Sequence, residues 1–143
     1  MSRRQGREAA LKTLFQVGLG GAQPDFALEQ LILEDGLTED AARFARRLID
    51  GVLAEQPEVD RILAQLSIDW SLKRMANIDR TLLRLAVYEL LFCPDIPVSV
   101  AINEAVELAK LYSTQQSSRF VNGILSSVAK RKFIRDGKND CNK

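Results

Sequence analysis

The sequence contains no histidine, and this absence removes several kinds of chemistry at once. Histidine is the commonest general base and metal ligand near neutral pH, so a Ser-His-Asp or Cys-His catalytic arrangement cannot be built from this chain. A di-metal carboxylate site with Glu-x-x-His ligands is excluded for the same reason. The two cysteines, Cys93 and Cys141, lack metal-ligand spacing and are expected to be free thiols in a reducing cytoplasm.

Other features are missing as well. There is no apolar run near 20 residues, so we expect no membrane span. The basic start MSRRQGRE leads into no apolar segment of the kind found in secretory signals. No GxxxxGK[ST] motif and no GxGxxG turn is present to cradle a nucleotide. We therefore expect a cytoplasmic protein that is not an enzyme and that uses no metal or cofactor.

The apolar residues that are present recur with helical spacing. Hydrophobic residues make up 46% of the 143 residues and charged ones 27%, an ordinary balance for one domain with its own core. Apolar positions recur every three or four residues in segments 78–90 and 98–112, and no useful run alternates as a strand would. Segment 78–91 is apolar almost all round, which predicts a helix at the centre of the domain. The fold class predicted is all-α.

Capping and breaking residues divide the chain into about seven expected helices. The first is expected to span residues 3 to 17. The second is expected to bury its inward face, which includes Phe26. The third is expected to end near residue 55, before a fourth begins. The residues expected to begin or end helices are Pro24, Gly36, Thr38, Pro57 and either Ser117 or Ser118. On the third helix, Arg43, Arg46 and Arg47 are expected to form a solvated face.

Charge is concentrated at the two ends of the chain. The formal net charge is +1, yet segments 1–12 and 130–143 are both basic and the segment between them is acidic. Basic ends on an acidic body are typical of a protein that binds a polyanion at its ends and a basic protein on its body. The alternative is that charged termini only keep the chain in solution, and composition leaves both possibilities open.

The basic residues Arg3, Arg4 and Arg7 lie in the first turn of the expected first helix. Cations there oppose the helix macrodipole at a cost of roughly 0.3–1 kcal/mol each. The same helix end attracts phosphate, and the guanidinium fork matches phosphate oxygens. This turn is therefore a candidate phosphate site. The alternative is a frayed, solvated helix start.

A polar tract, STQQSSRFVNG, precedes the last expected helix. Gln116 and Arg119 lie around its N-terminus, where amides and arginines can bind unpaired bases and phosphates. Phe120 is expected to pack in the core rather than stack on a base. Arg80 and Arg84 adjoin Asp79, and they are consistent either with an ion pair to a neighbouring helix or with a surface that docks a partner.

Four stretches of sequence resemble a known family. The segments RTLLRLAVYELLF, IPVSVAINEAVELAKLY and RFVNGIL resemble the C-terminal signature of the NusB family of bacterial transcription antitermination factors. The segment RRQGREAALKTLFQV is similar to the arginine-rich first helix of that family. The resemblance implies a single compact domain of two packed helical bundles over residues 1–132. Residues 133–143 are expected to form a basic, disordered tail.

The resemblance also implies a function. NusB-like proteins bind boxA, a single-stranded RNA element, together with NusE, a small ribosomal subunit protein, in the RNA polymerase antitermination complex. The matching RNA-binding residues are Arg3, Arg4, Arg7, Gln116 and Arg119, and those facing NusE are Phe15 and Asp79. This chain departs from some relatives at Phe15, where tyrosine is common, and at Gln116, where an acid can occur. The alternatives are a helical accessory module like the one that precedes some ribosomal RNA methyltransferase domains, and a module that binds only proteins.

Overall fold

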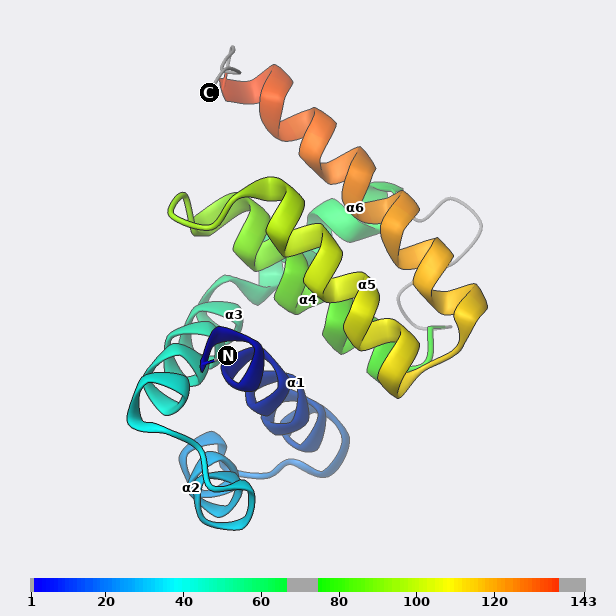
Figure 1. Ribbon diagram of the computed structural model, residues 1–143. Helices are drawn as coiled ribbons and strands as arrows, with labels where there is room; N and C mark the ends of the chain where they lie inside the picture. The colour runs from blue at the N-terminus through cyan, green and yellow to red at the C-terminus, as the bar shows by residue number, and fades with distance from the viewer. Residues whose placement is uncertain (1, 67–74, 137–143) are drawn as a thin grey trace.

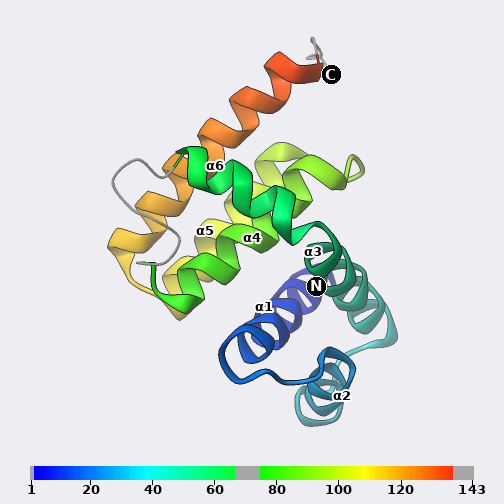
Figure 2. The ribbon, with the colours of Figure 1, turned by 180° about the vertical axis from the view of Figure 1, so that it is seen from behind.

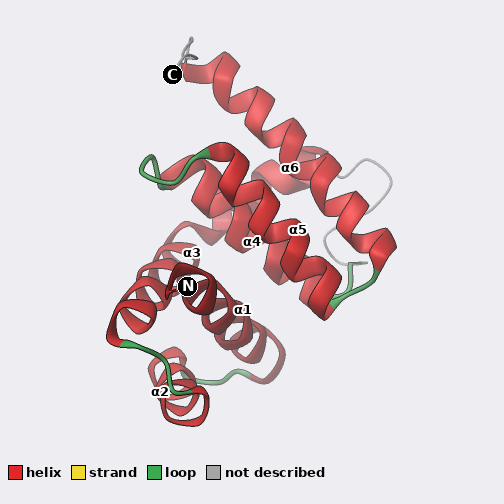
Figure 3. Cartoon of the chain, viewed as in Figure 1, coloured by secondary structure: helices red, strands yellow, loops and turns green. Residues whose placement is uncertain are grey.

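The computed structural model describes residues 2–66 and 75–136, which form helices joined by short connections (Figure 1). The helices are α1 (Ser2–Gly20), α2 (Pro24–Asp35), α3 (Glu39–Leu66), α4 (Asn77–Phe92), α5 (Val98–Tyr112) and α6 (Gln115–Asp136). No strand occurs in these two ranges (Figure 3), which confirms the all-α prediction. Trp70 and Cys141 lie outside the described residues.

The described part contains six helices rather than about seven, because the third and fourth expected helices are one. Helix α3 passes through Pro57, which has no N–H to donate to the preceding turn. Val52 on one side of the proline and Val59 on the other are both buried, so core packing holds the helix together across this position. The direction of α3 changes along its length (Figure 2), as expected for a helix that contains an internal proline.

Helices α1, α2 and α3 form the first of two groups, with α2 at its edge (Figure 1). Gly36 ends α2 in the left-handed conformation, at φ 64°, and Thr38 Oγ1 accepts the Ala41 N–H at 3.1 Å at the start of α3. Both predicted boundaries are confirmed. The inward position predicted for Phe26 is wrong. Helix α2 buries only a narrow stripe that includes Leu28, and Phe26 lies outside this stripe and is 62% exposed.

Helix α4 lies at the centre of the molecule, as its apolar sequence predicts. It packs against α1 and α3 on one side and against α5 and α6 on the other (Figures 1 and 2). Leu82, Leu83 and Leu85 are at most 1% exposed. Arg84 donates two hydrogen bonds to the Asp60 carboxylate on α3, at 2.8 and 2.9 Å, so of the two alternatives for this arginine the structure shows the ion pair between helices.

Helices α4, α5 and α6 form the second group, and the two groups share one core. The core includes Ala105 and Leu125, whereas Ile102 is only partly buried against it. Helix α6 continues to Asp136, beyond the domain boundary expected at residue 132, and residues 137–143 of the expected tail lie outside the described ranges. Among the described helices, none is both long enough and apolar enough to cross a bilayer.

Candidate nucleic-acid interface

A glycine near the start of α1 places the predicted arginines against α3. A Cβ atom at Gly6 would lie 2.9 Å from the Ala41 carbonyl oxygen and 2.9 Å from the Phe44 ring, so only glycine allows this close approach. As a result, the guanidinium carbons of Arg3 and Arg7 lie 4.6 and 5.3 Å from the centre of the Phe44 ring. These distances are within the range of cation–π attraction.

Arg7, predicted with Arg3 and Arg4 to contact phosphate, differs from them because its side chain is enclosed by protein. Its side chain is 4% exposed and forms an ion pair with Glu89 of α4, whose side chain is 3% exposed. Arg7 donates hydrogen bonds of 3.0 and 3.1 Å from Nε and one of 2.8 Å from Nη2. Burial raises the pKa of the Glu89 carboxyl, and the hydrogen bonds from Arg7 oppose that rise. In this arrangement Arg7 joins α1 to α4 and is enclosed by protein.

Arg3 and Arg4 remain at the surface, with side chains 51% and 59% exposed. Arg4 donates bidentate hydrogen bonds of 3.0 and 2.7 Å to Glu104 of α5, and it holds the pKa of that carboxyl below its usual range. Arg3 donates a longer bond, 3.3 Å, to Asp95 in the turn between α4 and α5. The pair of Arg3 and Asp95 is exposed on both sides and contributes little to stability, so Arg3 can change partner at small cost, whereas Arg4 is held more firmly because the Glu104 side chain is only 14% exposed.

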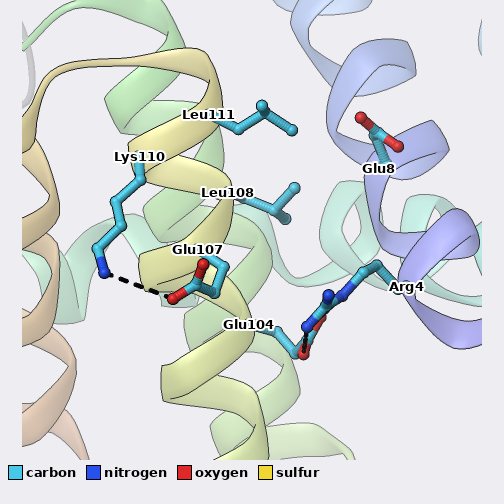
Figure 4. Close-up of a pocket in the computed structure, with 7 residues that line it drawn as sticks. All are labelled: Arg4, Glu8, Glu104, Glu107, Leu108, Lys110 and Leu111. Carbon is cyan, nitrogen blue, oxygen red and sulfur yellow. Dashed lines mark hydrogen bonds and ion pairs between the residues drawn. The ribbon is translucent and has the colours of Figure 1, made fainter.

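A hollow between α1 and α5 adjoins Arg4 (Figure 4). Leu108 and Leu111 point from α5 toward α1, and Glu8 faces them from α1 (Figure 4). The residues that line the hollow are Arg4, Glu8, Glu104, Glu107, Leu108, Lys110 and Leu111. Its carboxylates outnumber its cations, and Leu111 is 67% exposed. This hollow therefore suits a basic partner with apolar side chains better than it suits phosphate.

The second predicted site lies where α6 begins. Thr114 Oγ1 accepts the Ser117 N–H at 2.9 Å, so Thr114 caps α6 and the predicted cap at Ser117 or Ser118 is wrong. The helix consequently starts earlier than expected, at Gln115. Gln116 and Arg119 are exposed and lie within its first two turns, near the free backbone N–H groups of the helix end.

A second hollow joins this helix start to α4. It is lined by Met75, Asp79, Thr114, Gln116, Ser117 and Phe120. Ser117 Oγ donates a 2.9 Å hydrogen bond to Asp79 Oδ2, whereas Asp79 Oδ1 is buried and has no hydrogen-bond partner among the described residues. The structure thus brings Gln116, predicted to contact RNA, together with Asp79, predicted to contact a partner. Phe120 is partly buried against the core, as expected.

The two hollows follow one another along α5 and the turn after it. Leu111 lines the first and Thr114 lines the second, so they are separated by less than one helical turn of sequence. Phe15 is half-buried on α1, two turns beyond Glu8 and therefore on the same face of the helix. Among the described residues there is no group of three or more His, Cys, Asp or Glu side chains that could hold a metal ion.

Sequence reasoning missed one part of this surface. Arg47 of α3, expected on a solvated face, donates hydrogen bonds of 3.1 and 2.6 Å to Asp95, the same carboxylate that Arg3 contacts. Nothing in the spacing of the sequence links these three residues, because they lie on α1, on α3 and in the turn after α4. The contact became visible only in the folded chain.

Comparisons with known proteins point to one family. The model of the NusB family matches residues 4–130. The transcription antitermination protein NusB of Heliobacterium modesticaldum is 49% identical over 130 residues, which cover 91% of this chain and 63% of that protein. The chain therefore spans less than two thirds of that relative. The protein of the same name from Pelotomaculum thermopropionicum is 49% identical over 128 residues, which cover 90% of this chain and 89% of that protein.

Solved structures give the same result for the fold. A T. maritima NusB structure is 41% identical, with a TM-score of 0.81, and the match covers 92% of this chain and 96% of that one. A chain in the crystal structure of the antitermination factors NusB and NusE in complex with double-stranded RNA is 28% identical. Its TM-score is 0.84, and the match covers 91% of this chain and 97% of that chain.

Proposed function

This chain belongs to the NusB family, and we propose that it is a transcription antitermination factor that binds boxA-type single-stranded RNA together with NusE. In this role it supports processive transcription of ribosomal RNA by the RNA polymerase antitermination complex. It acts in the cytoplasm and without catalysis. We assign RNA binding to the domain formed by residues 1–132, and the basic segment 133–143 that follows begins within α6.

The observation that carries the RNA part is the exposed, arginine-bearing first turn of α1. Arg3 and Arg4 reach solvent at the positive end of a helix, where cations do not help the helix itself. Their forks are available to phosphate oxygens. We assign these two arginines to phosphate contacts. Arg7 has a positioning role, because its pair with Glu89 holds this turn against α4.

We assign recognition of the RNA bases to the start of α6. Gln116 and Arg119 are exposed there, and amide and guanidinium groups can hydrogen-bond the edges of unpaired bases. Arg4 pairs with Glu104 of α5, and Gln116 follows the end of that helix, so a single strand that passes outside the acidic hollow can contact both residues. Arg4 then fixes the backbone of the RNA, and Gln116 contributes to the preference for particular bases.

We assign the NusE surface to Phe15 and Asp79, with the acidic hollow of α1 and α5 beside them. Phe15 lies on the same face of α1 as Glu8, which lines that hollow. Leu111 offers an exposed apolar contact there. Asp79 lines the neighbouring hollow, where its carboxylate accepts the hydrogen bond from Ser117. A basic protein with apolar side chains complements this combination of charge and apolar area.

The RNA assignment is tested by titrating boxA RNA and a scrambled copy at several salt concentrations. The double variant Arg3→Ala/Arg4→Ala is expected to bind both RNAs more weakly and to similar extents. The salt slope is expected to flatten by roughly 0.7 for each lost single-strand phosphate contact. Gln116→Ala is expected to change the ratio of boxA to scrambled affinity more than it changes the slope. The control for net charge is Arg43→Ala/Arg61→Ala, which also removes two exposed arginines; among the contacts described, both pair only with carboxylates of their own helix, α3.

If the Arg3→Ala/Arg4→Ala variant matches the Arg43→Ala/Arg61→Ala control in both affinity and slope, the first turn of α1 is not a phosphate site. If the unaltered protein shows no salt-sensitive RNA binding with or without NusE, the function proposed is wrong. A module that binds only proteins then remains.

The NusE assignment is tested with Asp79→Asn, which keeps an oxygen to accept the Ser117 hydrogen bond but removes the charge. We expect weaker NusE binding with an unchanged melting temperature. Ser117→Ala is the matched control, because it removes the hydrogen bond and leaves the charge. Equal NusE affinity for Asp79→Asn and the unaltered protein would place the docking surface elsewhere.

A further inference from the structure

Two arginines from different helices converge on one carboxylate beside the predicted RNA-binding turn. Asp95, between α4 and α5, accepts hydrogen bonds of 3.1 and 2.6 Å from Arg47 and one of 3.3 Å from Arg3. Both guanidiniums also lie over the Phe44 ring, with the Arg47 carbon 5.8 Å from its centre. The side chains of Arg3, Arg47 and Asp95 are 51%, 38% and 47% exposed, so solvent and ligands reach all three.

The charges in this cluster do not cancel. Arg3 and Arg47 face a single carboxylate, and the adjacent Arg7–Glu89 pair is internally neutral. The cluster therefore keeps one surplus positive charge. The hollow beside Arg4 differs in this respect, because its carboxylates outnumber its cations. Of the two surfaces next to the first turn of α1, the side of Arg3 and Arg47 is the better one for an anion.

We propose that Arg3 and Arg47 form a phosphate-binding site for the RNA backbone, and that the Asp95 carboxylate occupies it until an RNA phosphate takes its place. The inference rests on the proposed RNA-binding function and adds Arg47, from α3, to the RNA surface. Asp95 thereby becomes an internal competitor of RNA.

The exchange is physically reasonable on two grounds. Ion pairs at this degree of exposure contribute little net stability, so giving up the pairs with Asp95 costs little. A phosphodiester has two non-bridging oxygens, and the guanidinium groups of Arg3 and Arg47 approach one point from two helices, so each can donate to the same phosphate. The Phe44 ring packs against both guanidinium groups and restricts their conformations, so less conformational entropy is lost when they bind a phosphate.

The test compares five single variants, including Arg3→Ala, in the boxA and scrambled RNA titrations. Arg47→Ala is expected to lower the affinity for both RNAs roughly three- to tenfold, the effect of losing one charge-assisted contact, and to flatten the salt slope by roughly 0.7. Arg47→Lys keeps the charge without the fork and is expected to fall between Arg47→Ala and the unaltered protein. Asp95→Asn is expected to bind both RNAs several-fold more tightly. Arg61→Ala on the same helix controls for the loss of one exposed positive charge.

The outcomes separate this inference from the proposed function. If Arg47→Ala behaves like Arg61→Ala while Arg3→Ala still weakens RNA binding, the site at Arg47 is refuted and the proposed function stands. If Asp95→Asn weakens binding as much as Arg47→Ala does, Asp95 orients the arginines and does not compete with RNA, so the exchange is refuted. If the unaltered protein does not bind RNA, the proposed function itself is refuted. Thermal melts of each variant establish that the compared proteins are folded.

Discussion

The buried pair of Arg7 and Glu89 offers the sharpest test of the structure. Their side chains are 4% and 3% exposed, and three hydrogen bonds between 2.8 and 3.1 Å join them across α1 and α4. Arg7→Met removes the charge and the donors while keeping an unbranched side chain in the same space. Glu89 is then left buried without its cation, and water cannot take over that role in the closed core.

The expected loss is large. Removing one partner of a buried ion pair costs about 3–5 kcal/mol, a substantial part of the roughly 5–15 kcal/mol by which a domain is stable. Replacing both partners, as Arg7→Met/Glu89→Leu, removes the uncompensated charge and is expected to recover most of that loss. The two substitutions are therefore strongly non-additive, as contacting residues should be.

Urea denaturation of the two single variants and the double variant measures this cycle directly. A single-variant loss below about 1 kcal/mol, or a double variant whose loss equals the sum of the two single ones, would refute the burial of the pair. Binding adds an independent readout. For folded protein, we expect Arg7→Met to reduce boxA affinity less than Arg3→Ala does, because Arg7 is enclosed and Arg3 is exposed.

Three other substitutions or titrations test local features. Gly6→Ala should lower the melting temperature although alanine favours a helix, because its Cβ would lie 2.9 Å from the Ala41 carbonyl oxygen; a stabilised variant would contradict that close approach. Thr114→Ala should cost about 0.5–2 kcal/mol in urea denaturation through loss of the α6 cap, and no loss would place the cap elsewhere. Burial raises the pKa of both tyrosines, Tyr88 and Tyr112, above the ordinary 10.0, with Glu8 adding to the rise at Tyr112. As pH rises, the unfolded chain releases these protons before the folded chain does. The stability that the two tyrosines contribute is therefore fully present below pH 10 and is lost as pH rises above it. A phenolate absorbance titration of the folded protein with midpoints at or below 10 would refute this.

Several elements followed from local sequence because their causes are local. The apolar spacing of α4 and α5 is a property of each helix alone, and Leu82 and Ala105, which belong to the apolar positions of these segments, are both buried. Gly36 and Thr38 act within one turn of their own position, so their roles as helix end and helix cap could be read directly. The all-α class required only these local patterns, and the resemblance of longer segments indicated the family.

Choices between equivalent local signals were made by tertiary packing. Thr114, Ser117 and Ser118 are all good capping residues, and the structure uses Thr114 while Ser118 is buried at 4% exposure. Pro57 is a helix breaker by local rules, yet the buried residues on both sides of it keep α3 continuous. Both decisions depend on contacts with other helices that a local pattern does not contain.

The candidate site shows the same division most clearly in its arginines. The sequence alone determined that the first turn of α1 is basic and that this charge does not serve the helix. Only the folded chain decided which arginine is enclosed, since Arg7 meets Glu89 across 82 positions of sequence while Arg3 stays at the surface. It also brought Arg47 to Asp95 beside Arg3. The physical reason is that a charge acts on whatever lies within a few ångströms of it, and helix packing, here permitted by Gly6, sets those neighbours.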